Sequence, residues 1–419
     1  MKRQTVVIIL VGLSLAMLPL GTQLLAQAQG LMPGGTLPPW APGVLDIHHI
    51  NTGKGDSALF IFPDGTSLLV DAGASLRPPP RITSQHPDSS RTTGEWIARY
   101  ARRMLGPGES LDYAILTHFH GDHMGDFSAH LKDSASGRYK LTGITEVSEH
   151  IPIARMMDRG WPAYNYPAPL ANPMLENYRS FLKQQVESNG MQVSRFQPGR
   201  NDQIVLTHEP RNYRNFEVRN ISANGEIWTG LASNTRQYFP PLESLPQRDW
   251  PSENMCSIAF RLSYGNFDYF IGGDMPGLPA EGSPAWHDVE TPVARAVGPV
   301  EVHVLNHHGY HDSANAFFLS TLRPRLHILS IYAPSHPGIR VLNRLLSTRL
   351  YPGPRDIFAT NIMEATKVVT GAQLERLKGD QGHILVRVDP GGDTFRVIVL
   401  DDSAESYEVK SVHGSYGSK

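Results

Sequence analysis

The sequence has little of the features that would restrict it to a special class. Cys256 is the only cysteine in 419 residues, which excludes an internal disulfide bond. The 38 Lys and Arg residues nearly balance the 40 Asp and Glu residues, so the formal net charge of −2 provides no bulk attraction to nucleic acid or to an anionic membrane surface. No internal repeat or low-complexity tract is visible. Hydrophobic residues make up 40%, which supports a globular core in one large domain or two modest ones.

Long hydrophobic runs are also lacking, except at the start of the chain. Lys2 and Arg3 precede an almost unbroken apolar stretch at 6–20, and an Ala-Gln-Ala sequence at 26–28 supplies a cleavage site. Residues 1–28 are therefore predicted to be a signal peptide that directs a bacterial protein to the periplasm or the exterior. The alternative is a membrane anchor, but the run is short for a span of about 20 residues. We expect no stable membrane span after processing.

Histidine, in contrast, is abundant, and its densest cluster lies at 111–126. The apolar residues Tyr113 to Leu116 predict a short buried strand. Three histidines and an aspartate follow it, interspersed with glycine: His118, His120, Asp122 and His123. Zinc and related divalent metals prefer imidazole and carboxylate ligands, and glycine lets the backbone turn so that short side chains converge. This loop predicts a metal site rather than a polar surface loop.

Other ligand-type residues also follow predicted strands. Strands are expected at 44–50, 57–62 and 67–70, and the last ends at Asp71. A carboxylate there is placed to hold a ligand histidine by its second ring nitrogen. The glycine-rich loop 51–56 contains Lys54, which is either a phosphate contact or a solvated turn residue.

The second half of the chain repeats this arrangement. Strands are expected at 256–263, at 267–271 before Asp274, at 302–305 before His307 and His308, and at 326–331 before His336. Because a ligand-type residue follows strand after strand, we predict an active site at one edge of a sheet sandwich.

The remaining segments are less informative. Residues 29–43 are rich in Pro and Gly and are predicted to be a flexible leader. Helices are expected at 94–104, from near Met124, from about 173 to 188, and at 339–346. Residues of about 130–250 are interpreted as an elaboration, which either covers one rim of the site or decorates the surface. A hairpin of 383–388 and 394–400 closes the domain at 44–400, and the polar tail 401–419 is expected to be frayed.

Taken together, these motifs resemble the metallo-β-lactamase superfamily. The His-x-His-x-Asp-His signature at 118–123 carries the resemblance. The order of PDGTSLLVDAG, LTHFHGDHMGD, GGDM, LNHHG and Ser-His-Pro is similar to the ComEC-type branch, the hydrolase domain of bacterial DNA-uptake channel proteins. The resemblance covers about 44–400 and implies an α/β fold, the αβ/βα sandwich, with two mixed sheets flanked by helices. Without the channel's membrane segments, it implies a free-standing exported hydrolase.

The resemblance also implies two divalent metal ions, with zinc as the first choice and manganese as the second. His118 and His120 would bind the first ion, Asp122 and His123 the second, and Asp274 would bridge them.

One ligand position has two candidate residues, and another position lacks the expected histidine. His308 would complete the second site, with His307 as its rival, and the other member of the pair would face substrate. Lactamases and lactonases add a third histidine to the first metal, but the corresponding place here, 253–255, reads Glu-Asn-Met. His208 could substitute, although a surface position is the simpler interpretation. The ComEC branch and the similar phosphorylcholine esterases share this reduced set.

The implied chemistry is hydrolysis. Two neighbouring metals bind a water as hydroxide near neutral pH and clamp the oxygens of an in-line displacement, which suits a phosphodiester in a small molecule or a nucleic acid. Asp122 would then be catalytic as well as a ligand. Lys54, His307 and His336 are candidate contacts to phosphate oxygens or the leaving group, although His336 could instead be a packing histidine. The alternatives are a lactone, lactam or thioester hydrolase on the same centre, or a non-catalytic metal-binding envelope protein.

Overall fold

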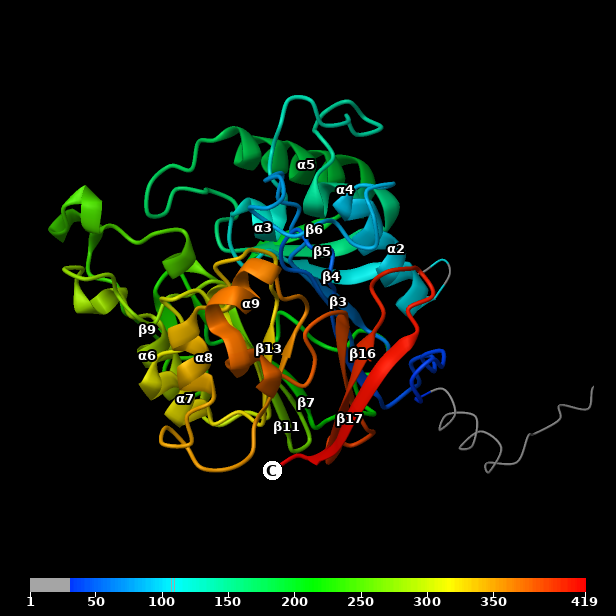
Figure 1. Ribbon diagram of the computed structural model, residues 1–419. Helices are drawn as coiled ribbons and strands as arrows, with labels where there is room; N and C mark the ends of the chain where they lie inside the picture. Colours follow the sequence, from blue (N-terminus) through cyan, green and yellow to red (C-terminus); the bar gives the residue numbers. More distant parts are fainter. Residues whose placement is uncertain (1–30, 107, 109) are drawn as a thin grey trace, which may run out of the picture.

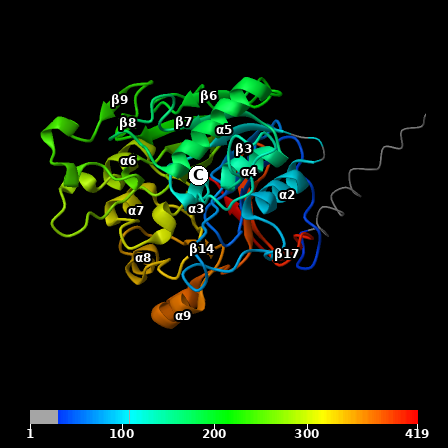
Figure 2. The same cartoon turned by 90° about the horizontal axis from the view of Figure 1, so that it is seen from above.

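Two mixed β-sheets lie face to face at the centre of the protein (Figure 1). The computed structural model describes residues 31–106, 108 and 110–419, so the predicted signal peptide at 1–28 lies outside the described residues. Among the residues described, no helix has both the length and the apolarity to span a bilayer. Helices cover the outer faces of the sheets, as the view from above also shows (Figure 2). The predicted fold class, two mixed sheets flanked by helices, is confirmed.

The first sheet has nine strands in the order β17-β16-β15-β1-β2-β3-β4-β5-β6. Its strands from β3 to β6 pair in parallel, and all its other neighbours are antiparallel. The strands are β1 (Leu45–His49), β2 (Ala58–Ile61), β3 (Ser67–Val70), β4 (Leu111–Ile115), β5 (Ile153–Asp158), β6 (Gln192–Arg195), β15 (His383–Val388), β16 (Thr394–Leu400) and β17 (Val409–Gly417).

The second sheet has eight strands in the order β14-β13-β12-β11-β10-β7-β8-β9. The strands from β11 to β14 pair in parallel, and the others are antiparallel. The strands are β7 (Phe216–Ala223), β8 (Glu226–Trp228), β9 (Thr235–Gln237), β10 (Ala259–Tyr264), β11 (Phe267–Ile271), β12 (Val302–Val304), β13 (Leu326–Leu329) and β14 (Asp356–Ala359).

The helices divide between the two sheets according to their apolar faces. Beside the first sheet lie α2 (Thr93–Leu105), α3 (Gly121–Met124), α4 (Gly143–His150) and α5 (Pro173–Asn189). Beside the second lie α6 (Glu290–Val297), α7 (Ala316–Leu322) and α8 (Ile339–Leu345), and α9 (Glu364–Thr370) follows β14. In α2, for example, Ile97 and Ala101 are buried while Arg102 and Arg103 face solvent, which is the pattern of a surface helix packed on a core.

The core between the sheets explains why the strands pair as they do. Phe60 of β2 lies 6.0 Å from Phe260 and 5.4 Å from Tyr269, measured between ring centroids, so side chains of the two sheets interdigitate. Such aromatic burial contributes more free energy to folding than any single polar contact. The same packing holds the ends of β3, β4, β11, β12 and β13 close together, and the functional site lies there.

Most predicted strands and helices are confirmed within one or two residues, including α5 from Pro173, but three predictions need local correction. The short helix expected to begin near Met124 instead ends there, because the backbone N–H groups of His123 and Met124 already bond to the carbonyl of His120. The strand expected from Cys256 begins at Ala259, after a 3₁₀ turn at Asn254–Cys256. The region of about 130–250 is more than decoration, because it supplies strands β5–β9 to both sheets.

The leader and the tail are ordered by each other, so the predictions of a flexible leader and a frayed tail are wrong for the described residues. In the leader, the Gly34 N–H donates to the Val409 carbonyl at 2.8 Å, and Thr36 forms a β-bridge with Glu408. Val409–Gly417 forms β17, the edge strand of the first sheet. Only Val409 and Tyr416 of this strand are buried, so its sequence lacks the alternation that identifies a half-buried strand.

Tyr416 offers a direct test of the order in the tail. Its ring stacks on Phe395 at a centroid distance of 5.2 Å, and its hydroxyl donates to Asp356 at 2.8 Å. We expect Tyr416→Ala to lower the free energy of unfolding by about 3 kcal/mol and Tyr416→Phe, which keeps the ring, by about 1 kcal/mol. Denaturant unfolding measures both. A frayed tail would leave both variants at the wild-type value.

Candidate metal centre

The candidate centre lies where strands of both sheets end at the same edge. β3 leads into Asp71, β4 into the 117–123 loop, and β11 into Asp274. β12 leads into a 3₁₀ turn at Asn306–Gly309, which contains His307 and His308, and the segment after β13 reaches His336. The predicted convergence of ligand-type residues at one edge is therefore present.

Close backbone contacts hold the 117–123 loop against its neighbours. The Asp56 N–H donates to the Asp122 carbonyl at 2.8 Å, and the Ala72 N–H donates to the His123 carbonyl at 2.7 Å. A Cβ atom on Gly73 would lie 2.0 Å from the Asp122 carbonyl oxygen. Glycine is thus required there by the approach of the two backbones, and the glycine-rich loop 51–56 is part of the site's frame.

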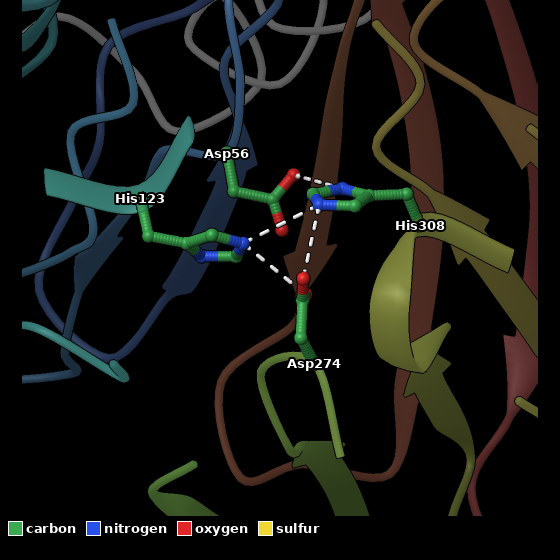
Figure 3. A group of neighbouring side chains, drawn as sticks. All are labelled: Asp56, His123, Asp274 and His308. Carbon is green, nitrogen blue, oxygen red and sulfur yellow. Dashed lines mark hydrogen bonds and ion pairs between the residues drawn. The ribbon is translucent and has the colours of Figure 1, made fainter. Parts of the chain in front are cut away.

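Four side chains form the first group of potential ligands: Asp56, His123, Asp274 and His308 (Figure 3). His123 Nε2 lies 3.3 Å from His308 Nε2 and 3.1 Å from Asp274 Oδ1. His308 Nε2 lies 3.5 Å from Asp274 Oδ2 and 3.2 Å from Asp122 Oδ2. Both histidines and Asp274 are buried.

The outer nitrogen of each histidine is already used as a donor. His123 Nδ1 lies 2.8 Å from Asp71 Oδ2, and His308 Nδ1 lies 3.1 Å from both the Ser330 carbonyl oxygen and Asp56 Oδ1. Since carbonyl and carboxylate oxygens only accept hydrogen bonds, Nδ1 carries the proton in both rings. In the neutral rings, the two Nε2 lone pairs therefore face each other and the carboxylates.

Such a cluster of acceptors requires positive charge between them. Burial opposes a charged imidazole, but Asp274 and Asp71 raise the pKa of His123 well above its usual value. Burial is likewise outweighed at His308, where Asp274 and Asp56 raise the pKa. Protons supply the charge when no metal is bound, and a divalent cation would replace them. The donor set of the buried cluster thus fits a metal ion.

The second group of potential ligands is His118, His120 and Asp274. His118 Nε2 lies 3.1 Å from His120 Nδ1 and 3.8 Å from Asp274 Oδ2. The Thr117 hydroxyl donates to Asp71 at 2.7 Å and lies 3.2 Å from His118 Nδ1. With its proton given to Asp71, the hydroxyl accepts from Nδ1 and leaves the Nε2 lone pair of His118 free. Asp274 belongs to both groups, as a bridging ligand must.

Asp56 and Asp71 have the same function for different histidines. Each carboxylate accepts from Nδ1 of a ring and so fixes its orientation, and Asp56 is in addition one of the first group of potential ligands. Asp71 was expected in this position from the sequence. Asp56 was not, because its contact with His308 joins residues 252 positions apart.

His307 lies beside Asp274 but makes its closest contacts outside the group that contains His308. Its Nδ1 lies 2.7 Å from Asp312 Oδ1, and its Nε2 lies 3.2 Å from the Asn254 amide nitrogen and 3.8 Å from Asp274 Oδ2. Of the two rivals, His308 is the one that belongs to a group of potential ligands. Asn254, in the stretch 253–255 where a third histidine was expected, contacts His307 and lines a cavity together with His120.

The residue before Asn254 supports the metal loop. Glu253 accepts the Phe119 N–H at 2.8 Å and forms an ion pair with the buried Arg159. His208 is exposed and contacts Asp112, so it does not substitute for the missing ligand.

A cavity of about 440 Å³ opens onto the centre. His307 and His336 both line it, as do Asn254, Tyr310 and Tyr332. His336 stacks on His308 at a centroid distance of 5.0 Å, and its Nδ1 has no hydrogen-bond partner among the described residues. His336 is thus both packed and directed at the site.

Lys54 and Tyr332 differ from the expectations. Lys54 lines a separate cavity that shares Ser75 and Arg77 with this one, so it is not brought into the site. Tyr332, which no sequence motif indicated, donates a hydrogen bond from its hydroxyl to Asp122 and packs edge-on against His308. Only the fold brings Tyr332 to the metal loop, 210 positions away in the chain.

Asp274 is the residue on which the two-ion arrangement depends. We expect Asp274→Asn to reduce the bound divalent metal by at least one ion per chain, because an amide neither bridges nor neutralises two cations. Elemental analysis after reconstitution measures this, and circular dichroism checks the fold. The matched control is Asp202→Asn at an exposed position, which should bind as wild type does. Full retention of two ions in Asp274→Asn would contradict the bridging role.

Asp56 and Asp71 provide a second test. Removing a carboxylate that orients a ligand histidine typically lowers metal affinity roughly 10–100-fold. We expect Asp56→Asn and Asp71→Asn each to show a loss of this size in a chelator competition titration, with Asp202→Asn again as the control. Unchanged affinity in both variants would mean that these contacts do not orient the ligands.

Two comparisons with known proteins give a match, and a third gives none. Residues 52–131 match the family model of the Metallo-beta-lactamase superfamily. No curated protein sequence gives a significant match. Among solved structures, the chain is similar to the crystal structure of CmlA, a diiron beta-hydroxylase from Streptomyces venezuelae, with 12% sequence identity and a TM-score of 0.38. The similarity covers 84% of this chain and 55% of CmlA, so the chain spans about half of that protein. The family match includes the metal loop, so this segment of the chain is similar to the metallo-β-lactamase superfamily.

Proposed function

We propose that the protein is a metal-dependent hydrolase that cleaves a phosphodiester. The observation that carries the proposal is the pair of ligand groups that share Asp274 on the floor of a polar cavity. Two bound divalent ions would supply Lewis acidity, a nucleophilic water near neutral pH, and a clamp for the oxygens of an in-line displacement. Zinc is the first choice and manganese the second, because imidazole and carboxylate ligands suit both.

The chain's own residues would divide the work as follows. His118, His120 and Asp274 would hold one ion, and Asp122 with His123 and the shared Asp274 would hold the other. His308 completes the second set. Asp56, Asp71 and Thr117 fix the imidazole rings by accepting their outer protons, so the ligands are oriented before the metal binds. Tyr332 restrains Asp122 through its hydroxyl.

His307 is the best-placed group to serve the leaving oxygen. It lines the cavity, Asp312 fixes its Nδ1, and its Nε2 faces Asn254 beside Asp274. As the imidazolium, His307 would hold a proton at Nε2 for the departing oxygen, and the Asn254 amide, no longer donating to that nitrogen, would donate a hydrogen bond to a phosphate oxygen. His336 stacks on His308. From that position, it would contact the substrate as well.

Asn254 favours a phosphodiester substrate over a lactam or lactone. Asn254 takes the place of a third imidazole and offers an amide donor to the cavity. A substrate that already carries negative charge gains from both the cations and the amide. The order of motifs similar to the ComEC branch supports the same choice, and the segment at 1–28 supports export to the periplasm or exterior.

An activity panel on purified, metal-reconstituted protein tests the proposal. We expect turnover of bis-p-nitrophenyl phosphate or p-nitrophenyl phosphorylcholine, and much slower turnover of a lactone and a cephalosporin. The His308→Ala variant should lose the activity because it lacks a ligand, whereas His208→Ala, at the exposed surface histidine, should keep it. Efficient cephalosporin hydrolysis with no phosphodiesterase activity would reverse the assignment. Bound metal with no hydrolysis of any of these substrates would favour a non-catalytic metal-binding protein.

A further inference from the structure

We propose that Arg77 forms a subsite for a second anionic group on the substrate, apart from the scissile phosphodiester, and that Asp126 positions it. This proposal rests on the proposed function and narrows its substrate class. The substrate would be a small phosphodiester that also carries a phosphate monoester or a carboxylate.

Arg77 is the one Lys or Arg among the described residues that line the cavity over the metal centre. Within the described part of the chain, no carboxylate lies within 4.0 Å of its guanidinium. The side chain is exposed. An arginine on a cavity wall that is free of an internal ion pair has its planar array of donors available to a ligand, and this array matches phosphate and carboxylate oxygens two at a time.

The backbone that leads into Arg77 is held by the residues that follow the metal loop. Asp126 Oδ2 accepts the Leu76 N–H at 2.8 Å and lies 3.4 Å from the Ser75 hydroxyl. The Asp126 N–H donates in return to the Ala74 carbonyl at 3.1 Å. A Cβ atom on Gly121 would lie 1.7 Å from Asp126 Oδ1, so glycine makes room for this carboxylate. The segment 74–77 is therefore held in register with the ligands at 118–123.

The far side of the same loop is anchored as well. Three prolines at 78–80 follow Arg77 directly, and each restricts its own φ angle. The Thr83 N–H then donates to the Tyr332 carbonyl at 2.8 Å, and the Thr83 hydroxyl donates to the Gly53 carbonyl at 2.7 Å. Arg77 thus stands at the start of a stiff segment tied at both ends to the frame of the metal centre, which reduces the entropy lost when its side chain binds a ligand.

The charge of the cavity limits the substrate to a small molecule. A long nucleic acid requires a row of cationic side chains along its backbone, but among the described residues the cavity lining contains a single cationic side chain, Arg77. A single guanidinium facing a cavity of about 440 Å³ suits one further anionic group. The three carboxylates that share the lining, Asp122, Asp126 and Asp274, are engaged with the metal ligands or with the 74–77 backbone.

A matched series of substrates tests the subsite. The series consists of the p-nitrophenyl ester of thymidine 5′-phosphate with a free 3′-hydroxyl, a 3′-phosphate or a 3′-hemisuccinate. We expect Arg77→Ala to lower kcat/KM for one or both esters with a second anionic group roughly 10–100-fold more than for the ester with a free 3′-hydroxyl, mainly through KM, which is the scale of one charge-assisted contact. If the 3′-phosphate ester is the one affected, the natural group is a phosphate. If the 3′-hemisuccinate is affected, it is a carboxylate. Asp126→Asn should raise KM for the same ester with kcat retained, and Arg81→Ala, in the same loop but outside the cavity lining, is the control.

Calorimetric binding separates this proposal from the hydrolase assignment. Thymidine 3′,5′-bisphosphate should bind the metal-loaded protein more tightly than thymidine 5′-phosphate, and Arg77→Ala should abolish the difference. If binding depends on Arg77 but no ester is hydrolysed, the proposed function fails while the subsite stands. If Arg77→Ala changes the binding and the kinetics of all three esters by the same factor, or changes none of them, the subsite is overturned. Affinity for single-stranded DNA that increases with its length would overturn the restriction to small substrates.

Discussion

The crowding of hydrogen-bond acceptors around Asp274 is the constraint on which the rest of the site depends. The Nε2 atoms of His123 and His308 approach to 3.3 Å, and each faces the same carboxylate. Carbonyl and carboxylate groups behind both rings use the Nδ1 protons, so the rings cannot relieve the crowding by exchanging tautomers. Positive charge must enter the cluster. Burial opposes the charged form of His308. Burial also favours a raised pKa for the Asp274 carboxyl, yet His123 and His308 hold that pKa well below its usual range.

The fold maintains this costly arrangement by distributing its ligands over two sheets. Each sheet is stabilised by its own layer of helices and by the core between the sheets, so the loops at the common edge do not carry the stability of the protein. Glycine at 73 and 121 permits the 74–77 segment, the metal loop and Asp126 to approach more closely than any other residue would. The same contacts place Arg77 on the cavity wall. Metal binding and substrate recognition are therefore built on one set of backbone interactions.

The sequence predicted the parts of this site that depend on local spacing. The 118–123 cluster, Asp71 at the end of β3 and Asp274 after β11 all follow apolar strands, and strands are readable from short patterns. Asp56 and Tyr332 were missed because their partners lie 252 and 210 positions away, and no local pattern encodes such a contact. Lys54 was predicted as a phosphate contact from its charge and its glycine-rich loop, but it lines a neighbouring cavity. The edge strand β17 was missed for a different reason, since most of its residues are solvent-accessible on both faces.

The central claim is that two cations replace the protons of the buried cluster and share Asp274. Anomalous diffraction from crystals of the metal-reconstituted protein, collected on both sides of the metal absorption edge, tests it most directly. The account predicts two peaks, one beside His118 and His120 and one beside His123 and His308, with an oxygen of Asp274 within bonding distance of each. A single peak, or metal bound at residues other than these, would contradict it.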